Sequence, residues 1–268
     1  MSVIDTHCHL EEEVFDADRL DLLRRARSTG VSAIISVGVE PSGWLAQRRV
    51  WDVINGLPDR SDLPSIYLAF GLHPWKVAEP TGDWLAELRT QLSSAEAVVA
   101  LGEVGLDFAP GMPDEALQRR VFEAQLGLAR EFSLPLILHA RKSEDRLLWY
   151  LRRQPDLRGV VHGFTGSAQQ AAAFVDQGFF IGVGGAITHE RASRLRSVIA
   201  AVPIDHLLLE TDAPFQPGAA HRGQRNEPAF IWDNLDCLAK LHHCSVAAMA
   251  AQTSENARRL FGIAINDD

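Results

Sequence analysis

Residues 98–107 read VVALGEVGLD, and residues 134–139 read LPLILH after a segment with helical spacing. The residues that carry this spacing are Leu117, Val121, Gln125 and Leu128. Both flanking runs begin as uninterrupted apolar stretches rather than alternating ones, which is typical of parallel strands that helices cover. This part of the chain therefore predicts a strand–helix–strand unit with parallel strands.

Apolar runs of the same kind recur along the chain, and segments with helical spacing separate most of them. The eight runs that we predict as strands are Val3–Asp5, Val31–Val37, Ile66–Phe70, Val98–Leu101, Leu134–Leu138, Val160–Val161, Phe179–Val183 and His206–Leu209. Eight strand–helix units in 268 residues predict one (β/α)8 TIM-type barrel domain spanning residues 1–268. A doubly wound open sheet competes with this fold, although no GxGxxG follows the first run as in its dinucleotide-binding form.

The composition is that of an acidic globular protein. Hydrophobic residues make up 46%, and 26 Lys and Arg stand against 35 Asp and Glu, a net charge of −9. This balance disfavours a protein that coats long duplexes through a broad basic surface. The three cysteines form no CxxC pair, and no apolar stretch approaches the ~18 residues of a membrane span. We expect a cytoplasmic protein with no membrane contact and no obligate protein partner.

The first run leads into two histidines, His7 and His9. Side chains of an extended strand alternate between its faces, so both imidazoles are expected on the same side. Two imidazoles so placed at the carboxyl end of a strand can chelate a divalent metal ion. Packing or hydrogen bonding is the alternative for such a pair.

Polar residues follow several other runs in the same way. The positions are Glu103 and Asp107, His139 and Arg141, His162, and Glu210 and Asp212. At the carboxyl ends of barrel strands such residues are usually catalytic. Nitrogen and oxygen donors without a thiolate suit one or two divalent cations. Two ions ~3.5–4 Å apart, bridged by a carboxylate, would form a clamp for phosphoester cleavage.

Seven ordered motifs resemble those of the TatD-type metal-dependent hydrolases, in the amidohydrolase-like superfamily. They are DTHCHL from residue 5, GLHP from 71, GEVGLDF from 102, LILHAR from 136, VVHGFTGS from 160, ETDAP from 210 and RNEP from 225. The resemblance covers nearly the whole chain and is closest to the YjjV-like branch. It implies a TIM-type barrel, two divalent ions (Zn, Mn, Mg or Co) and phosphodiesterase or deoxyribonuclease activity on DNA ends or another small phosphoester.

The resemblance also implies roles for individual residues. His7 and His9 would hold the first ion with Asp212, Glu103 would bridge both ions, and the second would be held by His139 and His162. Asp212 and Glu103 are then expected to act in catalysis. Asp212 can also accept a proton from the attacking water, because a carboxylate offers two oxygens.

Five further residues are candidates with open alternatives. His73 could bind the scissile phosphate or protonate the leaving group, or it could be structural. Glu210 could be a base behind the ligands or a residue of the barrel interior. Arg141, Arg225 and Asn226 are the expected substrate contacts, since arginine binds phosphate bidentately. The alternative for the loop arginine is a salt bridge that pins the loop, which we favour for Glu227.

Two other functions remain possible for the sequence. The same two-metal site could hydrolyse an ester or amide, such as an aminoacyl-nucleotide ester, which fold analogy does not separate from a phosphodiester. A non-catalytic, metal-stabilised scaffold is a third possibility. It is disfavoured because structural metal sites are usually closed and rich in thiolates.

Overall fold

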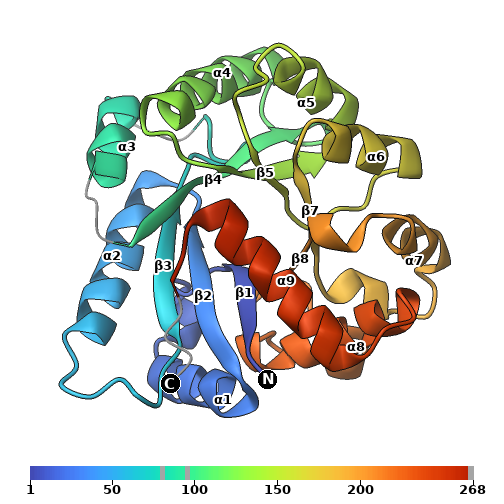
Figure 1. Ribbon diagram of the computed structural model, residues 1–268. Helices are drawn as coiled ribbons and strands as arrows, with labels where there is room; N and C mark the ends of the chain where they lie inside the picture. Colours follow the sequence, from blue (N-terminus) through green and yellow to red (C-terminus); the bar gives the residue numbers. More distant parts are fainter. Residues whose placement is uncertain (79–81, 94–96, 265–268) are drawn as a thin grey trace.

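The fold is a barrel of eight parallel strands surrounded by helices, in a computed structural model that describes residues 1–78, 82–93 and 97–264 (Figure 1). The strands are β1 (Val3–Cys8), β2 (Val31–Gly38), β3 (Ser65–Phe70), β4 (Val98–Asp107), β5 (Leu136–Arg141), β6 (Gly159–Val161), β7 (Phe180–Val183) and β8 (Leu207–Leu209). They pair in sequence order, each parallel to the next. A parallel bridge between Cys8 and Ala213 links β1 to the segment after β8. This confirms the predicted barrel and excludes the open sheet.

Helices follow seven of the strands, and two close the chain. They are α1 (Arg19–Thr29), α2 (Pro41–Asn55), α3 (Trp84–Ser93), α4 (Glu115–Glu131), α5 (Glu144–Leu151), α6 (Ala168–Asp176), α7 (Ser193–Ala200), α8 (Ile231–Leu241) and α9 (Val246–Phe261). Side chains of Asp83, Asp114, Ser167 and Ser245 accept backbone N–H groups at the starts of α3, α4, α6 and α9. In the described part of the chain, no helix is both long and apolar enough to cross a membrane.

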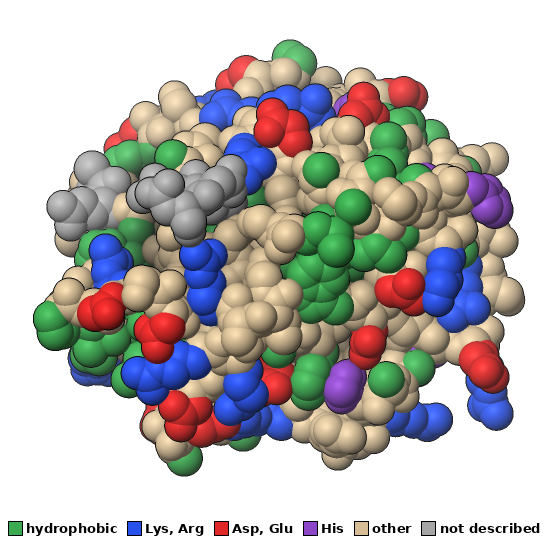
Figure 2. All heavy atoms as spheres, turned by 60° about the horizontal axis from the view of Figure 1, so that its bottom comes forward, with side chains coloured by type: hydrophobic (Ala, Val, Ile, Leu, Met, Phe, Trp, Pro, Cys, Tyr) green, Lys and Arg blue, Asp and Glu red, His purple; other side chains and the backbone are tan. Residues whose placement is uncertain are grey.

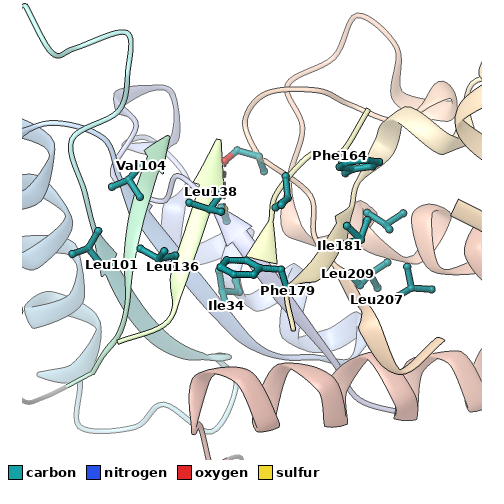
Figure 3. Close-up of a cluster of buried hydrophobic side chains, with 14 of the residues drawn as sticks. Ile34, Leu101, Val104, Leu136, Leu138, Phe164, Phe179, Ile181, Leu207 and Leu209 are labelled. Atoms are coloured by element: carbon teal, nitrogen blue, oxygen red, sulfur yellow. Dashed lines mark hydrogen bonds between the residues drawn. The ribbon is translucent and has the colours of Figure 1, made fainter. Parts of the chain in front are cut away.

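Two hydrophobic clusters hold the barrel together. The larger one lies between the strands and the surrounding helices, and Figure 3 shows part of it. Its labelled members are Ile34, Leu101, Val104, Leu136, Leu138, Phe164, Phe179, Ile181, Leu207 and Leu209. The smaller cluster joins strand residues such as Ile4 and Ile137 to Leu260 and Phe261 of α9.

Helix α9 covers the end of the barrel at which the strands begin. Ser254 donates a hydrogen bond to the carbonyl of Ser2, and Asn256 donates to those of Ile204 and Leu207. In Figure 1 this red helix crosses the front of the barrel. The polar residues of the candidate site lie at the opposite end of the barrel, where the strands finish.

Several strand boundaries differ from the prediction. The largest difference is in β4, which continues beyond the predicted end at Leu101 as far as Asp107 and so includes Glu103. The apolar run was expected to end at Leu101, but Gly105 lets β4 continue and pass very close to His139 of β5. The fifth strand begins at Leu136 rather than Leu134 and ends at Arg141. Glu103 and Asp107 therefore lie within β4, and His139 and Arg141 lie within β5, rather than after these strands.

Candidate metal centre

Six of the predicted ligands meet at the carboxyl ends of five strands. They are His7 in β1 and His9 just after it, Glu103 in β4, His139 in β5, His162 just after β6, and Asp212 after β8. All are buried except His139, whose side chain is 13% exposed. Because the carboxyl ends of the strands meet at one end of the barrel, residues up to 205 positions apart in sequence come together there.

Glu103 lies at the centre, and its two carboxylate oxygens face different histidines. Oε1 lies 2.8 Å from His139 Nδ1 and 3.0 Å from His162 Nε2. Oε2 lies 3.4 Å from His7 Nε2 and 3.9 Å from His9 Nε2. Burial alone would raise the pKa of Glu103, but the surrounding histidines hold it well below its usual value. The carboxylate is therefore charged and shared between two groups of nitrogen donors.

The first group consists of His7, His9 and Asp212. The two Nε2 atoms are 3.2 Å apart, and Asp212 Oδ1 lies 3.6 Å from the first and 3.3 Å from the second. Asp212 takes a left-handed backbone conformation (φ 60°), while its N–H donates to the carbonyl of His7 at 2.9 Å. Gln216 Nε2 donates to its Oδ2 at 2.5 Å. Backbone and side chain together aim one carboxylate oxygen at the pair of histidines.

In His9, His139 and His162, the nitrogen that points away from the cluster faces an oxygen atom. His9 Nδ1 lies 2.8 Å from the carbonyl oxygen of Val37, which can only accept, so this nitrogen carries the hydrogen. His139 Nε2 faces Asp107 Oδ2 at 3.3 Å, and His162 Nδ1 faces Glu210 Oε1 at 3.4 Å. Carboxylates and carbonyls behind histidines are the usual support of metal ligands.

The donor set fits divalent cations. Three groups of ligand atoms each lie within 4.8 Å of one another: His7, Glu103 and His162; His7, His9 and Asp212; and His73, Glu103 and His139. The donors are nitrogen and carboxylate oxygen, which suits borderline and hard ions. Burial alone would lower the pKa of His162, but Glu103 and Glu210 raise it well above its usual value. This concentration of charge is typical of a functional site.

His73 and Glu210 both reach the cluster. His73 Nδ1 accepts the backbone N–H of Trp75 at 3.1 Å, so its Nε2 carries the hydrogen and faces Glu103 at 3.2 Å. Glu210 accepts the N–H of Gly163 at 2.5 Å and supports His162 from behind. Of its two predicted roles, this position favours the one behind the ligands.

Asp107 and Trp75 contribute to the site, although the sequence placed Asp107 only among the polar strand-end residues and assigned no role to Trp75. Asp107 is fully buried, and it accepts a hydrogen bond from Trp75 Nε1 at 2.7 Å besides contacting His139. Burial alone would raise the pKa of Asp107, but His139 and Trp75 lower it to about 2. The acidic residue at the end of GEVGLD was the available signal for Asp107. The sequence around Trp75 carried no such signal, because Trp75 lies in the loop after β3 and its partner Asp107 lies in β4.

Of the three expected substrate contacts, one is open to solvent at the rim. Arg141 has a side chain that is 56% exposed, with Nη1 3.8 Å from Asp107 Oδ2. Asn226 instead donates to the carbonyls of Thr211 and Phe215, at 2.8 and 2.7 Å, and is buried. These contacts give Asn226 a role in holding the loop that carries Asp212.

Arg225 is also engaged within the protein. Its guanidinium donates to Asp18 at 2.7 and 2.8 Å and lies over the ring of Phe15, 5.0 Å from the centroid. Arg25 joins Asp18 to Glu227, at 3.0 and 2.6 Å. The pinning role that we favoured for Glu227 is therefore present, and the same alternative applies to Arg225 rather than the substrate contact.

Replacing Asp18 with asparagine should loosen this attachment. Hydrogen bonds from Arg225 and Arg25 lower the pKa of Asp18 to about 2, so its contribution is present above about pH 4 and is lost towards pH 2. Because the pairs are partly exposed, we expect Asp18→Asn to lower the free energy of unfolding at pH 7 by only about 1 kcal/mol. Urea denaturation measures this difference, which added salt should reduce.

Asp21→Asn is the matched control, since Asp21 forms an exposed pair with Arg24 within α1, the helix that Asp18 precedes. It should change the free energy of unfolding much less. Equal effects of the two substitutions would contradict the pinning role of Asp18.

Comparisons with known proteins agree with this geometry. A family model described as "TatD related DNase" matches residues 4–262. The uncharacterized metal-dependent hydrolase YjjV of Escherichia coli is 39% identical over 97% of this chain and 98% of its own. The 3'-5' ssDNA/RNA exonuclease TatD of Erwinia tasmaniensis is 35% identical over 97% of this chain and 100% of its own.

Similarity to a solved structure leads to the same assignment. The crystal structure of YjjV from Escherichia coli matches with a TM-score of 0.89 and 37% sequence identity, covering 98% of each chain. This similarity spans the barrel and every strand end described above. The chain belongs to the TatD family of metal-dependent hydrolases.

Proposed function

We propose that this protein hydrolyses phosphodiester bonds at the ends of single-stranded DNA, with two divalent ions bound at the cluster. The observation that carries the proposal is the position of Glu103, whose two oxygens face two separate groups of histidines. A carboxylate so placed suits a bridge between two ions, and paired ions clamp the attacking and leaving oxygens of a phosphoester. The relative named as an exonuclease acts on single-stranded DNA and RNA, which supports this substrate class.

The surface charge supports a local rather than an extended contact with nucleic acid. The net charge is −9, and basic and acidic side chains are interspersed on the face shown in Figure 2. Arg141 stands at the rim of the cluster with more than half of its side chain exposed. Its guanidinium can bind a phosphate next to the scissile one.

The roles of the ligands follow from their partners. Bound divalent ions would acidify a water molecule and neutralise charge on the phosphate oxygens. We assign the first ion to His7, His9 and Asp212, the second to His139 and His162, and the bridge to Glu103. The identity of the ions, among Zn, Mn, Mg and Co, is open to the test below.

Two side chains are placed to move protons. Asp212 turns Oδ1 toward His7 and His9, where it would hold the ion, so Oδ2, which accepts from Gln216, is the oxygen left to accept a proton from the attacking water. His73 carries its hydrogen on Nε2, which faces the cluster, and it can donate to the leaving oxygen. Glu210 acts through His162, which it orients.

The test is hydrolysis of a labelled single-stranded oligonucleotide by protein stripped of metal and then supplied with Mg, Mn, Zn or Co. Release of nucleotides that depends on the ion and is absent from Glu103→Ala supports the proposal. No cleavage with any ion, by folded protein that binds two ions, would contradict it. Ester and amide substrates would then be tested with the same protein.

Metal loading itself should stabilise the fold. Ions that bind only the folded state stabilise it by about 2.7 kcal/mol at a concentration 100 times their Kd. For a protein of this size we expect the Tm to rise by about 5–10 °C. Calorimetry with and without the ion measures this shift, and elemental analysis after gel filtration should find two ions per chain. An unchanged Tm with all four ions would argue against metal binding.

A further inference from the structure

Two exposed aromatic side chains stand beside the metal-ligand cluster. Trp75 is 48% exposed and Phe215 is 49% exposed. The ring of Trp75 lies edge-on to His73 and His139, at centroid distances of 4.9 and 5.9 Å. The ring of Phe215 lies edge-on to His9, at 5.6 Å. Single exposed apolar residues are common on proteins, so the exposure alone would carry no argument.

Their position on both sides of the cluster distinguishes these two rings. Phe215 contacts a histidine of the group facing Glu103 Oε2, whereas Trp75 contacts two histidines on the Oε1 side. The cluster therefore lies between the rings. Among the described residues only one other tryptophan or phenylalanine is exposed, Trp149 of helix α5.

Hydrogen bonds within the protein position the ring of Trp75 and the backbone of Phe215. Trp75 Nε1 donates to Asp107 Oδ2 at 2.7 Å. The backbone N–H of Phe215 donates to the carbonyl of Asp212 at 2.8 Å, and its own carbonyl accepts from Asn226. Rigid aromatic side chains provide contact area at a low cost in conformational entropy.

We propose that Trp75 and Phe215 form two stacking sites for the nucleobases on either side of the scissile phosphate. This inference rests on the proposed function and specifies how the substrate is recognised. Every base has a flat π-face, so stacking on an aromatic ring binds a single strand with little sequence preference. In a duplex the same faces are covered by neighbouring base pairs. The two rings therefore select unpaired ends, while the ligand cluster between them takes the phosphate.

The test compares binding of two strands that differ only in their bases. One is a short phosphorothioate oligothymidylate, and the other is an abasic strand with the same number of phosphorothioate linkages. Both carry a fluorescent dye, and anisotropy with the Mn-loaded protein gives each Kd. Since stacking is the difference between the strands, the wild-type protein should bind the thymidine strand about tenfold more tightly.

The variants assign that preference to the rings. Phe215→Leu keeps an apolar side chain without a π-face, and it should lose most of the preference for the thymidine strand. Phe215→Tyr should retain it, and Trp75→Leu should reduce it as Phe215→Leu does. Trp149→Leu removes an exposed indole away from the cluster and is the matched control, with an unchanged ratio of the two Kd values.

Failure of this inference and failure of the proposed function give different results. Wild-type protein that cleaves unmodified oligonucleotide but binds both strands equally would overturn the stacking sites and leave the nuclease assignment standing. A preference unchanged in both Phe215→Leu and Trp75→Leu would do the same. Wild-type protein that neither binds nor cleaves any strand would overturn both.

Discussion

Replacing Glu103 with glutamine is expected to lower kcat by about 10³-fold or more, because the proposed bridge between two ions would be lost. Glutamine matches glutamate in size, so the change removes charge rather than volume. In the folded protein Glu103 faces histidines with both oxygens, the nearest being His139 at 2.8 Å. An amide replaces one of these oxygens with an NH₂ group, which donates and does not bind a cation.

The same substitution should reduce metal content. Elemental analysis of Glu103→Gln after gel filtration should find at most one tightly held ion, against two in the wild type. Glu131→Gln is the matched control, since Glu131 is an exposed glutamate that pairs with Arg89 on the outside of the barrel. It should keep both ions and full activity. A Glu103→Gln protein that keeps two ions and more than a tenth of the activity would contradict the bridging role.

The carboxyl ends of the barrel strands could be predicted from two features of the sequence. Uninterrupted apolar runs identify buried parallel strands, and polar residues where such runs stop lie at one end of the barrel. This reasoning found His7, His9, His139 and His162, and the structure brings all four together. The central position of Glu103 came only from the family resemblance. From the residues alone, β4 was expected to stop at Leu101.

Contacts between segments that are far apart in the sequence could not be predicted. Arg225 was expected to contact the substrate, but its guanidinium pairs with Asp18, which directly precedes α1 and is 207 residues away in sequence. Trp75, in the loop after β3, donates a hydrogen bond to Asp107 at the end of β4. Neither contact follows a period in the sequence, because each depends on how a loop lies over the completed barrel. Asp107 was visible in its motif, yet its role became clear only with His139 beside it.

Replacing Gly105 with alanine is expected to lower the free energy of unfolding by about 3 kcal/mol or more, and to reduce activity strongly. Gly105 has a φ of 150°, which disfavours any side chain. A Cβ at this position would lie 2.0 Å from the carbonyl oxygen of His139 and 2.9 Å from its carbonyl carbon. Because both atoms are backbone, strand β5 must move away from β4 to relieve the clash. That movement carries His139 away from Glu103.

Gly111→Ala separates the clash from the backbone strain. Gly111 also has a positive φ, 88°, but a Cβ there would meet nothing within 4 Å. We expect it to cost about 1 kcal/mol, the ordinary penalty of alanine in this conformation, with kcat close to wild type. Urea denaturation and oligonucleotide hydrolysis of the two variants provide the comparison. If Gly105→Ala were no less stable than Gly111→Ala and kept its activity, the close approach of β4 to β5 would not be what positions His139. The larger loss in Gly105→Ala would instead show that this glycine lets one strand place a ligand of its neighbour.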